Sequence, residues 1–187
     1  HVVYKASEQV YSLTNAKGAK MDVTFRVSNN GVAFRYSFPE TSTEIKKIAS
    51  EATSYKFAQG AKGFLQPMSV AKTGWCQTNN SYEEHYISDV TPGTESPLKA
   101  GWIYPALFKV NDTWVLISEA SLGRNYCGTR LVPGIDGNDY KIGFPDPREV
   151  FTNGVAFPES TLPWATPWRV MAIGTLANVT ESTMGTD

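Results

Sequence analysis

The chain has 187 residues, of which 41% are hydrophobic and 19% charged, with a formal net charge of −1 and a pI near 6.2. This length suits a single domain with a sizeable core. The balanced charge gives no electrostatic reason to expect nucleic acid or an anionic membrane as a partner, and no apolar run is long enough for a membrane span.

Two stretches near the amino terminus, residues 20–27 and 32–38, alternate apolar and polar side chains with a period of two. An Asn-Gly pair between alternating runs favours a β-hairpin, so we expect Asn30-Gly31 to form its loop. That register pairs apolar and aromatic side chains on one face, as a stable antiparallel ladder prefers. The rings expected to face the core are those of Phe25, Phe34 and Tyr36.

The same register has a consequence for the opposite face of the hairpin. It places Arg26 opposite Arg35, where like charges repel. We therefore expect carboxylates near this pair, or else a loop of another length.

Later stretches rich in aromatic and β-branched residues are separated by Gly, Pro and Asn turn clusters. They are SYKF (54–57), YEEHYIS (82–88), PALFKV (105–110), TWVLISEA (113–120) and TPWRVMAIG (166–174). Residues 45–52 are the one candidate for a short helix, and their capping signals are poor. Many short strands with intervening turns predict an all-β domain, an antiparallel sandwich or barrel.

One acidic residue lies on an apolar face. Alternation along TWVLISEA places Glu119 on the same face as Ile117. A carboxylate in that position is either paired or bound to a cation. Arg169, which interrupts the apolar run of TPWRVMAIG, would be the natural salt-bridge partner, because a guanidinium cannot be neutralised in a protein. Calcium is the alternative, since it binds carboxylate oxygens, although one glutamate cannot complete such a site.

The remaining candidate residues carry less specific signals. Trp75 and Trp168 are possible sugar-facing aromatics, although tryptophan lies more often in a core. Cys76 and Cys127 are too few for a disulfide framework, and whether they pair is open. The sequence contains no G-x-S-x-G, H-E-x-x-H or phosphate-loop motif, so no catalytic residue is predicted.

Four segments occur in a characteristic order: FRVSNNGVAFRY (25–36), SEATSYKF (50–57), ISEASLGRNYCG (117–128), and TPWRVMAIG (166–174) with ESTMGTD (181–187). Together they resemble the amino-terminal domain of glycoside hydrolase family 97, and the resemblance covers most of the chain. It implies a β-supersandwich, mutarotase-like in shape, that packs on a catalytic (β/α)₈ barrel later in the polypeptide. Residues 1–187 would then be an incomplete single domain, the latter part of that sandwich.

The resemblance also implies a function. Members of the family cleave α-linked sugars, as α-glucosidases or α-galactosidases, and their catalytic residues lie in the barrel. It implies that Glu119 is a calcium ligand at the domain interface, with Arg169 orienting or pairing with it. An oligo- or polysaccharide substrate and a periplasmic or secreted bacterial location are expected on the same ground. The alternative is a free-standing carbohydrate-binding or structural sandwich module.

Overall fold

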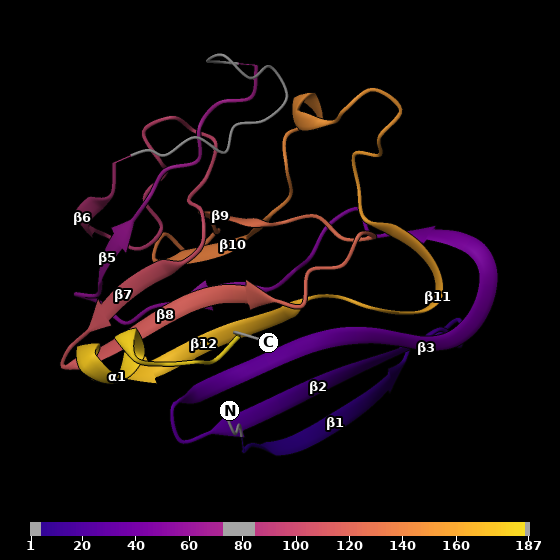
Figure 1. Ribbon diagram of the computed structural model, residues 1–187, viewed down its shortest axis with the longest axis horizontal. Coiled ribbons are helices and arrows are strands. Elements are labelled where there is room, and N and C mark those ends of the chain that lie inside the picture. The colour runs from indigo at the N-terminus through magenta and orange to yellow at the C-terminus, as the bar shows by residue number, and fades with distance from the viewer. Residues whose placement is uncertain (1–4, 73–84, 186–187) are drawn as a thin grey trace.

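The computed structural model describes residues 5–72 and 85–185, which form two antiparallel β-sheets (Figure 1). The strands are β1 (Ser7–Thr14), β2 (Lys20–Ser28), β3 (Gly31–Lys47), β4 (Ser54–Lys56), β5 (Lys62–Leu65), β6 (Ile87–Val90), β7 (Ala106–Val110), β8 (Thr113–Ala120), β9 (Arg130–Pro133), β10 (Asp139–Gly143), β11 (Glu159–Ala165) and β12 (Trp168–Gly174). The helical elements are the 3₁₀ turn η1 (Pro147–Glu149) and the helix α1 (Leu176–Thr180). The predicted all-β antiparallel class is confirmed.

The larger sheet has the strand order β1-β2-β3-β12-β8-β7-β5-β6, with β11 also paired to β3, and the smaller sheet has the order β4-β10-β9. In Figure 1, β3 is a long curved strand that pairs with β11 towards its carboxyl end. Within the two described ranges, no helix has the length and apolar character needed to cross a membrane.

The main core lies between the two sheets. Phe108 of β7 and Ile117 of β8 belong to one cluster with Leu131 of β9 and Tyr140 of β10, and none of them is more than 1% exposed. Burying side chains of this size stabilises the fold by about 1.5–3 kcal/mol each. This core holds β8 against the smaller sheet and so fixes the surroundings of Glu119 on the same strand.

The predicted hairpin forms from β2 and β3, but its loop lies one residue earlier than expected. Ser28 pairs with Gly31, so Asn29-Asn30 is the loop and Gly31 begins β3. A side chain on Gly31 would overlap the carbonyl oxygen of Met171 on the neighbouring strand. The glycine is therefore needed for close strand packing and not for the turn, and the predicted register is wrong by two positions.

The register also explains how two arginines share one face. Arg26 lies opposite Ala33 and not opposite Arg35. Both guanidinium carbons lie 4.5 Å from the centroid of the Trp168 ring, and Arg26 also pairs with Glu8 at 2.7 Å. Cation–π contacts and one carboxylate thus offset the expected repulsion.

The aromatic face of the hairpin keeps its predicted side, because a shift of two residues preserves the face of every side chain. Phe25, Phe34 and Tyr36 form a row with ring centroids 5.7 and 6.0 Å apart. All three are only half-buried. Ala33 and Val170, on the opposite face, are 7% and 4% exposed. The rings point inward as predicted, but burial is shared between both faces of this part of the sheet.

The candidate helix over residues 45–52 does not form. β3 continues to Lys47 because its carboxyl end pairs with β11, and the Ile48 amide then donates to the Pro158 carbonyl at 3.0 Å. These partners satisfy the backbone groups that a helix would otherwise have to pair internally. The predicted strand at 82–88 appears only as β6, from Ile87 onward, and residues 82–84 lie outside the described ranges.

Candidate functional site

The two charged residues singled out in the sequence meet in the core. Arg169 on β12 lies directly opposite Glu119 on β8, and its Nη1 donates to Glu119 Oε1. Arg169 Nε donates to Glu51 Oε1 at 2.9 Å, and Nη2 donates to Glu51 Oε2. The exposed fractions of the three side chains are 0% for Arg169, 6% for Glu51 and 4% for Glu119. We call these three residues the buried triad.

Both carboxylates of the triad have further partners. Glu119 accepts hydrogen bonds from the Thr129 amide at 3.0 Å and from the Thr129 hydroxyl at 2.6 Å. Glu51 accepts from the hydroxyls of Thr53 at 2.8 Å and Tyr126 at 3.1 Å. Every carboxylate oxygen is therefore bonded, as a buried ionic group requires.

Glu51 and Arg169 of the triad are held in their ionised forms. Burial alone would raise the pKa of Glu51, but the hydrogen bonds and positive charge of Arg169, with the Thr53 and Tyr126 hydroxyls, outweigh it and lower that pKa below its usual value. Burial would lower the pKa of Arg169, yet Glu51 and Glu119 raise it above its usual value. Burial also raises the pKa of the Tyr126 phenol, and the Glu51 charge adds to the increase. These groups do not exchange protons near neutral pH, which suits a structural role.

Sequence reasoning found Arg169 and Glu119 but missed Glu51. This residue lies in the connection between β3 and β4, within the stretch that was a candidate for a short helix. A signal was nevertheless present, because Glu51, Thr53 and Tyr55 alternate and would share one face of an extended chain. Thr53 and Tyr55 are each 7% exposed, so that face is indeed buried.

The described residues do not by themselves form a calcium site at Glu119. Both of its oxygens are engaged, by Arg169 and by Thr129. Calcium takes six to eight oxygen ligands. Within residues 5–72 and 85–185, no three His, Cys, Asp or Glu side chains come together in a group that could hold a metal ion. In this geometry Glu119 is a partner of Arg169.

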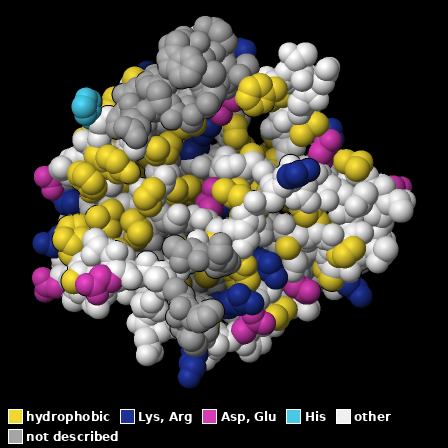
Figure 2. All heavy atoms as spheres, viewed as in Figure 1, with side chains coloured by type: hydrophobic (Ala, Val, Ile, Leu, Met, Phe, Trp, Pro, Cys, Tyr) yellow, Lys and Arg dark blue, Asp and Glu magenta, His cyan; other side chains and the backbone are white. Residues whose placement is uncertain are grey.

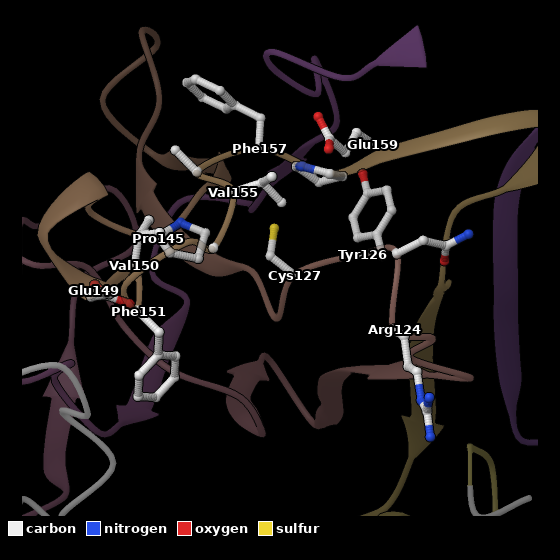
Figure 3. Close-up of a pocket in the computed structure, with 14 residues that line it drawn as sticks. Arg124, Tyr126, Cys127, Pro145, Glu149, Val150, Phe151, Val155, Phe157 and Glu159 are labelled. Atoms are coloured by element: carbon white, nitrogen blue, oxygen red, sulfur yellow. The ribbon is translucent and has the colours of Figure 1, made fainter. Parts of the chain in front are cut away.

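Tyr126 connects the triad to an open hollow of about 740 Å³, shown in Figure 3. Cys127 lines the hollow beside it and carries a free thiol. Burial raises the pKa of this thiol to about 11, so it is not activated as a nucleophile. Cys76 lies outside the described ranges, and the question of its pairing with Cys127 stays open.

Of the two tryptophans considered as possible sugar-facing aromatics, Trp168 lies in the described part of the chain. Trp168 is 6% exposed and its ring contacts the guanidinium groups of Arg26 and Arg35. The interpretation of Trp168 as a sugar-facing aromatic therefore does not fit this geometry, because little of its ring is free. Trp75, the other candidate, lies outside the described ranges.

The chain is similar to a known protein family over its full length. The family described as "Glycosyl-hydrolase 97 N-terminal" matches residues 1–187. The chain belongs to this family. A curated relative, a "Probable retaining alpha-galactosidase" of Streptomyces bingchenggensis (strain BCW-1), is 30% identical over 170 residues, which are 91% of this chain and 23% of the relative.

Solved structures share the fold of this chain. The crystal structure of a beta-arabinopyranosidase matches with a TM-score of 0.84 and 39% identity, over 92% of this chain and 28% of that one. A glycoside hydrolase family 97 enzyme from Pseudoalteromonas sp. strain K8, in complex with acarbose, matches with a TM-score of 0.72 and 22% identity, over 98% of this chain and 26% of that one. This chain thus spans about a quarter of the length of these relatives.

Proposed function

We propose that this chain is the non-catalytic amino-terminal part of an exo-acting α-glycosidase, an α-glucosidase or α-galactosidase that acts on oligo- or polysaccharides. In this proposal it packs on the catalytic barrel of the same polypeptide. The observation that carries the proposal is the family match over all 187 residues, together with a relative named as a retaining alpha-galactosidase. A periplasmic or secreted bacterial location for the parent enzyme is part of the same proposal.

The buried triad supports a non-catalytic role. A glycosidase places two carboxyl groups on either side of the scissile bond, with the sugar between them. Glu51 and Glu119 instead hold the guanidinium of Arg169 between them, and both are almost inaccessible to solvent. A sugar ring cannot enter a space that a charged and fully bonded side chain already fills.

Turnover measurements test this proposal. The purified 187-residue chain should not hydrolyse aryl α-glucosides, aryl α-galactosides or aryl β-arabinopyranosides, whereas the parent enzyme should hydrolyse at least one α-linked member of the panel. Turnover by the pure chain, or a parent reading frame without a downstream barrel, would overturn the proposal.

We also propose a calcium ion at the interface with the barrel in the parent enzyme, with Glu119 among its ligands. The other oxygens would have to come from outside this chain, and Glu119 would have to release Arg169 or Thr129. Arg169 would remain paired with Glu51 after such a release, so its charge would not be left without a partner.

A second function, a carbohydrate-binding module, is favoured by a different surface. Phe64 and Tyr86 are stacked with centroids 4.8 Å apart and are each 41% exposed. Phe64 and Trp114 line a hollow of about 540 Å³ together with Asp89 and Lys109. Figure 2 shows hydrophobic side chains gathered on the side of the molecule where β5, β6 and β7 lie. Pockets of this size, lined by rings and a few polar groups, suit small ligands.

Affinity electrophoresis in gels containing soluble polysaccharide separates the two functions. A binding module would be retarded, and Phe64→Ala would abolish the retardation. If the folded wild-type chain migrates without retardation, the carbohydrate-binding function is rejected. The role as a non-catalytic domain of a larger enzyme then stands.

A further inference from the structure

The connection between β10 and β11 is a long segment, residues 144–158, whose one regular element among the described residues is η1. Loops of this length in a compact domain usually have a function. The first half is firmly anchored, because Glu149 pairs with Arg130 of β9 at 2.8 Å with side chains 13% and 6% exposed. The Asp146 side chain also caps η1. The segment is thus held in place although it lacks strand pairing.

The second half of this segment exposes large apolar side chains. Phe151 is 67% exposed, Val155 57% and Phe157 42%. All three line the hollow beside Tyr126 and Cys127 (Figure 3). We call this space the apolar hollow and define it by five of its lining residues: Tyr126, Cys127, Phe151, Val155 and Phe157. A single exposed apolar residue needs no explanation, but several around one concavity mark an interaction surface.

Of the three charged side chains that line the apolar hollow, two already form ion pairs. Glu149 is paired with Arg130, and Glu159 is paired with Lys47 at 3.1 Å. Arg124, which also lines the hollow and is exposed, forms no ion pair with any residue in the described ranges. The surface therefore offers apolar contacts and one cation that a partner's carboxylate could match.

We propose that the apolar hollow is the surface on which the catalytic barrel of the parent polypeptide docks, with an apolar side chain of the barrel inserted beside Cys127 and an acidic residue facing Arg124. This inference rests on the proposed function. The partner is assigned to the same polypeptide because this chain spans only 23–28% of the curated relative and the beta-arabinopyranosidase. A sugar fits the hollow less well, because the Tyr126 hydroxyl and the Glu149 and Glu159 carboxylates that line it already have partners.

The Cys127 thiol provides a probe within the hollow itself. After reduction, the 187-residue chain and the parent enzyme are treated with N-ethylmaleimide at pH 8.5, and modification of the Cys127 peptide is followed by mass spectrometry. We expect the thiol to react about tenfold or more slowly in the parent enzyme, because a covered group reacts only when the contact opens. Equal rates in the two folded proteins would overturn the inference. Slow modification of the chain alone, with a doubled mass in solution, would instead assign the surface to a second copy.

Two variants of the parent enzyme make the test independent of whether the chain folds alone. Phe151→Asp should raise the Cys127 modification rate by about tenfold, since a charge cannot be buried unpaired at a docked surface. Ile135→Asp is the matched control, because Ile135 is 93% exposed and lies outside the hollow; it should leave the rate unchanged. If Phe151→Asp leaves Cys127 protected, or Ile135→Asp exposes it, the barrel docks elsewhere. A parent that hydrolyses glycosides but fails this test refutes the docking surface alone, and the proposed function stands.

Discussion

Arg169 places a permanent charge in a position that is 0% exposed, and it depends on two carboxylates. Removing one partner from a buried ionic group typically costs about 3–5 kcal/mol, because the remaining charges are left uncompensated. Arg169→Met should therefore lower the free energy of unfolding by about 3–5 kcal/mol. Urea denaturation followed by tryptophan fluorescence measures this.

An exposed pair of the same chemistry provides the control for that prediction. Arg148 pairs with Asp146 at 2.7 Å, but its side chain is 56% exposed. Solvent screening keeps such pairs near 0–1 kcal/mol, so Arg148→Met should cost about 1 kcal/mol or less. Similar losses in both variants would argue against the triad as a stabilising centre.

Glu51 makes the free energy of unfolding depend on pH. Its pKa in the folded state is lowered from 4.5, because Arg169 and two hydroxyls outweigh the effect of burial. The unfolded chain then binds a proton more readily, so the contribution of Glu51 is present above pH 4.5 and is lost as the pH falls through the folded-state pKa. The free energy of unfolding should decline below pH 4.5, and Glu51→Gln should make the decline shallower. Denaturation curves from pH 6 to pH 3 test this, and an unchanged slope in Glu51→Gln would contradict it.

At the scale of the strands, Gly31 controls how closely β3 approaches β12. A Cβ at this position would overlap the Met171 carbonyl oxygen and lie 2.6 Å from the sulfur of Met184. Because backbone atoms cannot rotate away, Gly31→Ala should destabilise the chain by about 1–3 kcal/mol. Gly128→Ala is the matched control, since no atom lies within 4 Å of its added Cβ; it should be neutral or slightly stabilising. The melting temperatures of both variants test this prediction. An equal change in the two would show that the close contact at Gly31 does not limit stability.

At the scale of the whole molecule, the calcium proposal predicts a difference between this chain and its parent. Calcium should not raise the melting temperature of the 187-residue chain, because both Glu119 oxygens are engaged. In the parent it should stabilise by about 2.7 kcal/mol at a hundredfold excess over Kd, and chelation should reverse this. Glu119→Gln should weaken calcium binding measured by calorimetry, whereas Glu44→Gln, which changes an exposed ion pair with Lys46 outside the triad, should not. Equal affinities in the wild type and Glu119→Gln would reject Glu119 as a ligand.

Several features of this protein follow from the sequence alone. A period of two specifies which face each side chain takes, and it placed Glu119 beside Ile117 and the hairpin rings on one face. A guanidinium within an apolar run demanded a carboxylate, which correctly indicated that Arg169 would be paired. The order of four motifs indicated the family. Each of these conclusions depends on local periodicity or on the chemistry of a single group.

The tertiary structure decided the rest, because the remaining features depend on residues far apart in the chain. Arg169 binds Glu51 across 118 positions, so no local pattern could select that acid over another. The hairpin register depends on Met171 and Met184, which approach Gly31 only after β3 and β12 have paired. The apolar hollow forms where residues 144–158 meet Tyr126 and Cys127. Local alternation specifies faces, whereas long-range packing specifies partners, and a partner becomes defined only when the sheets have assembled.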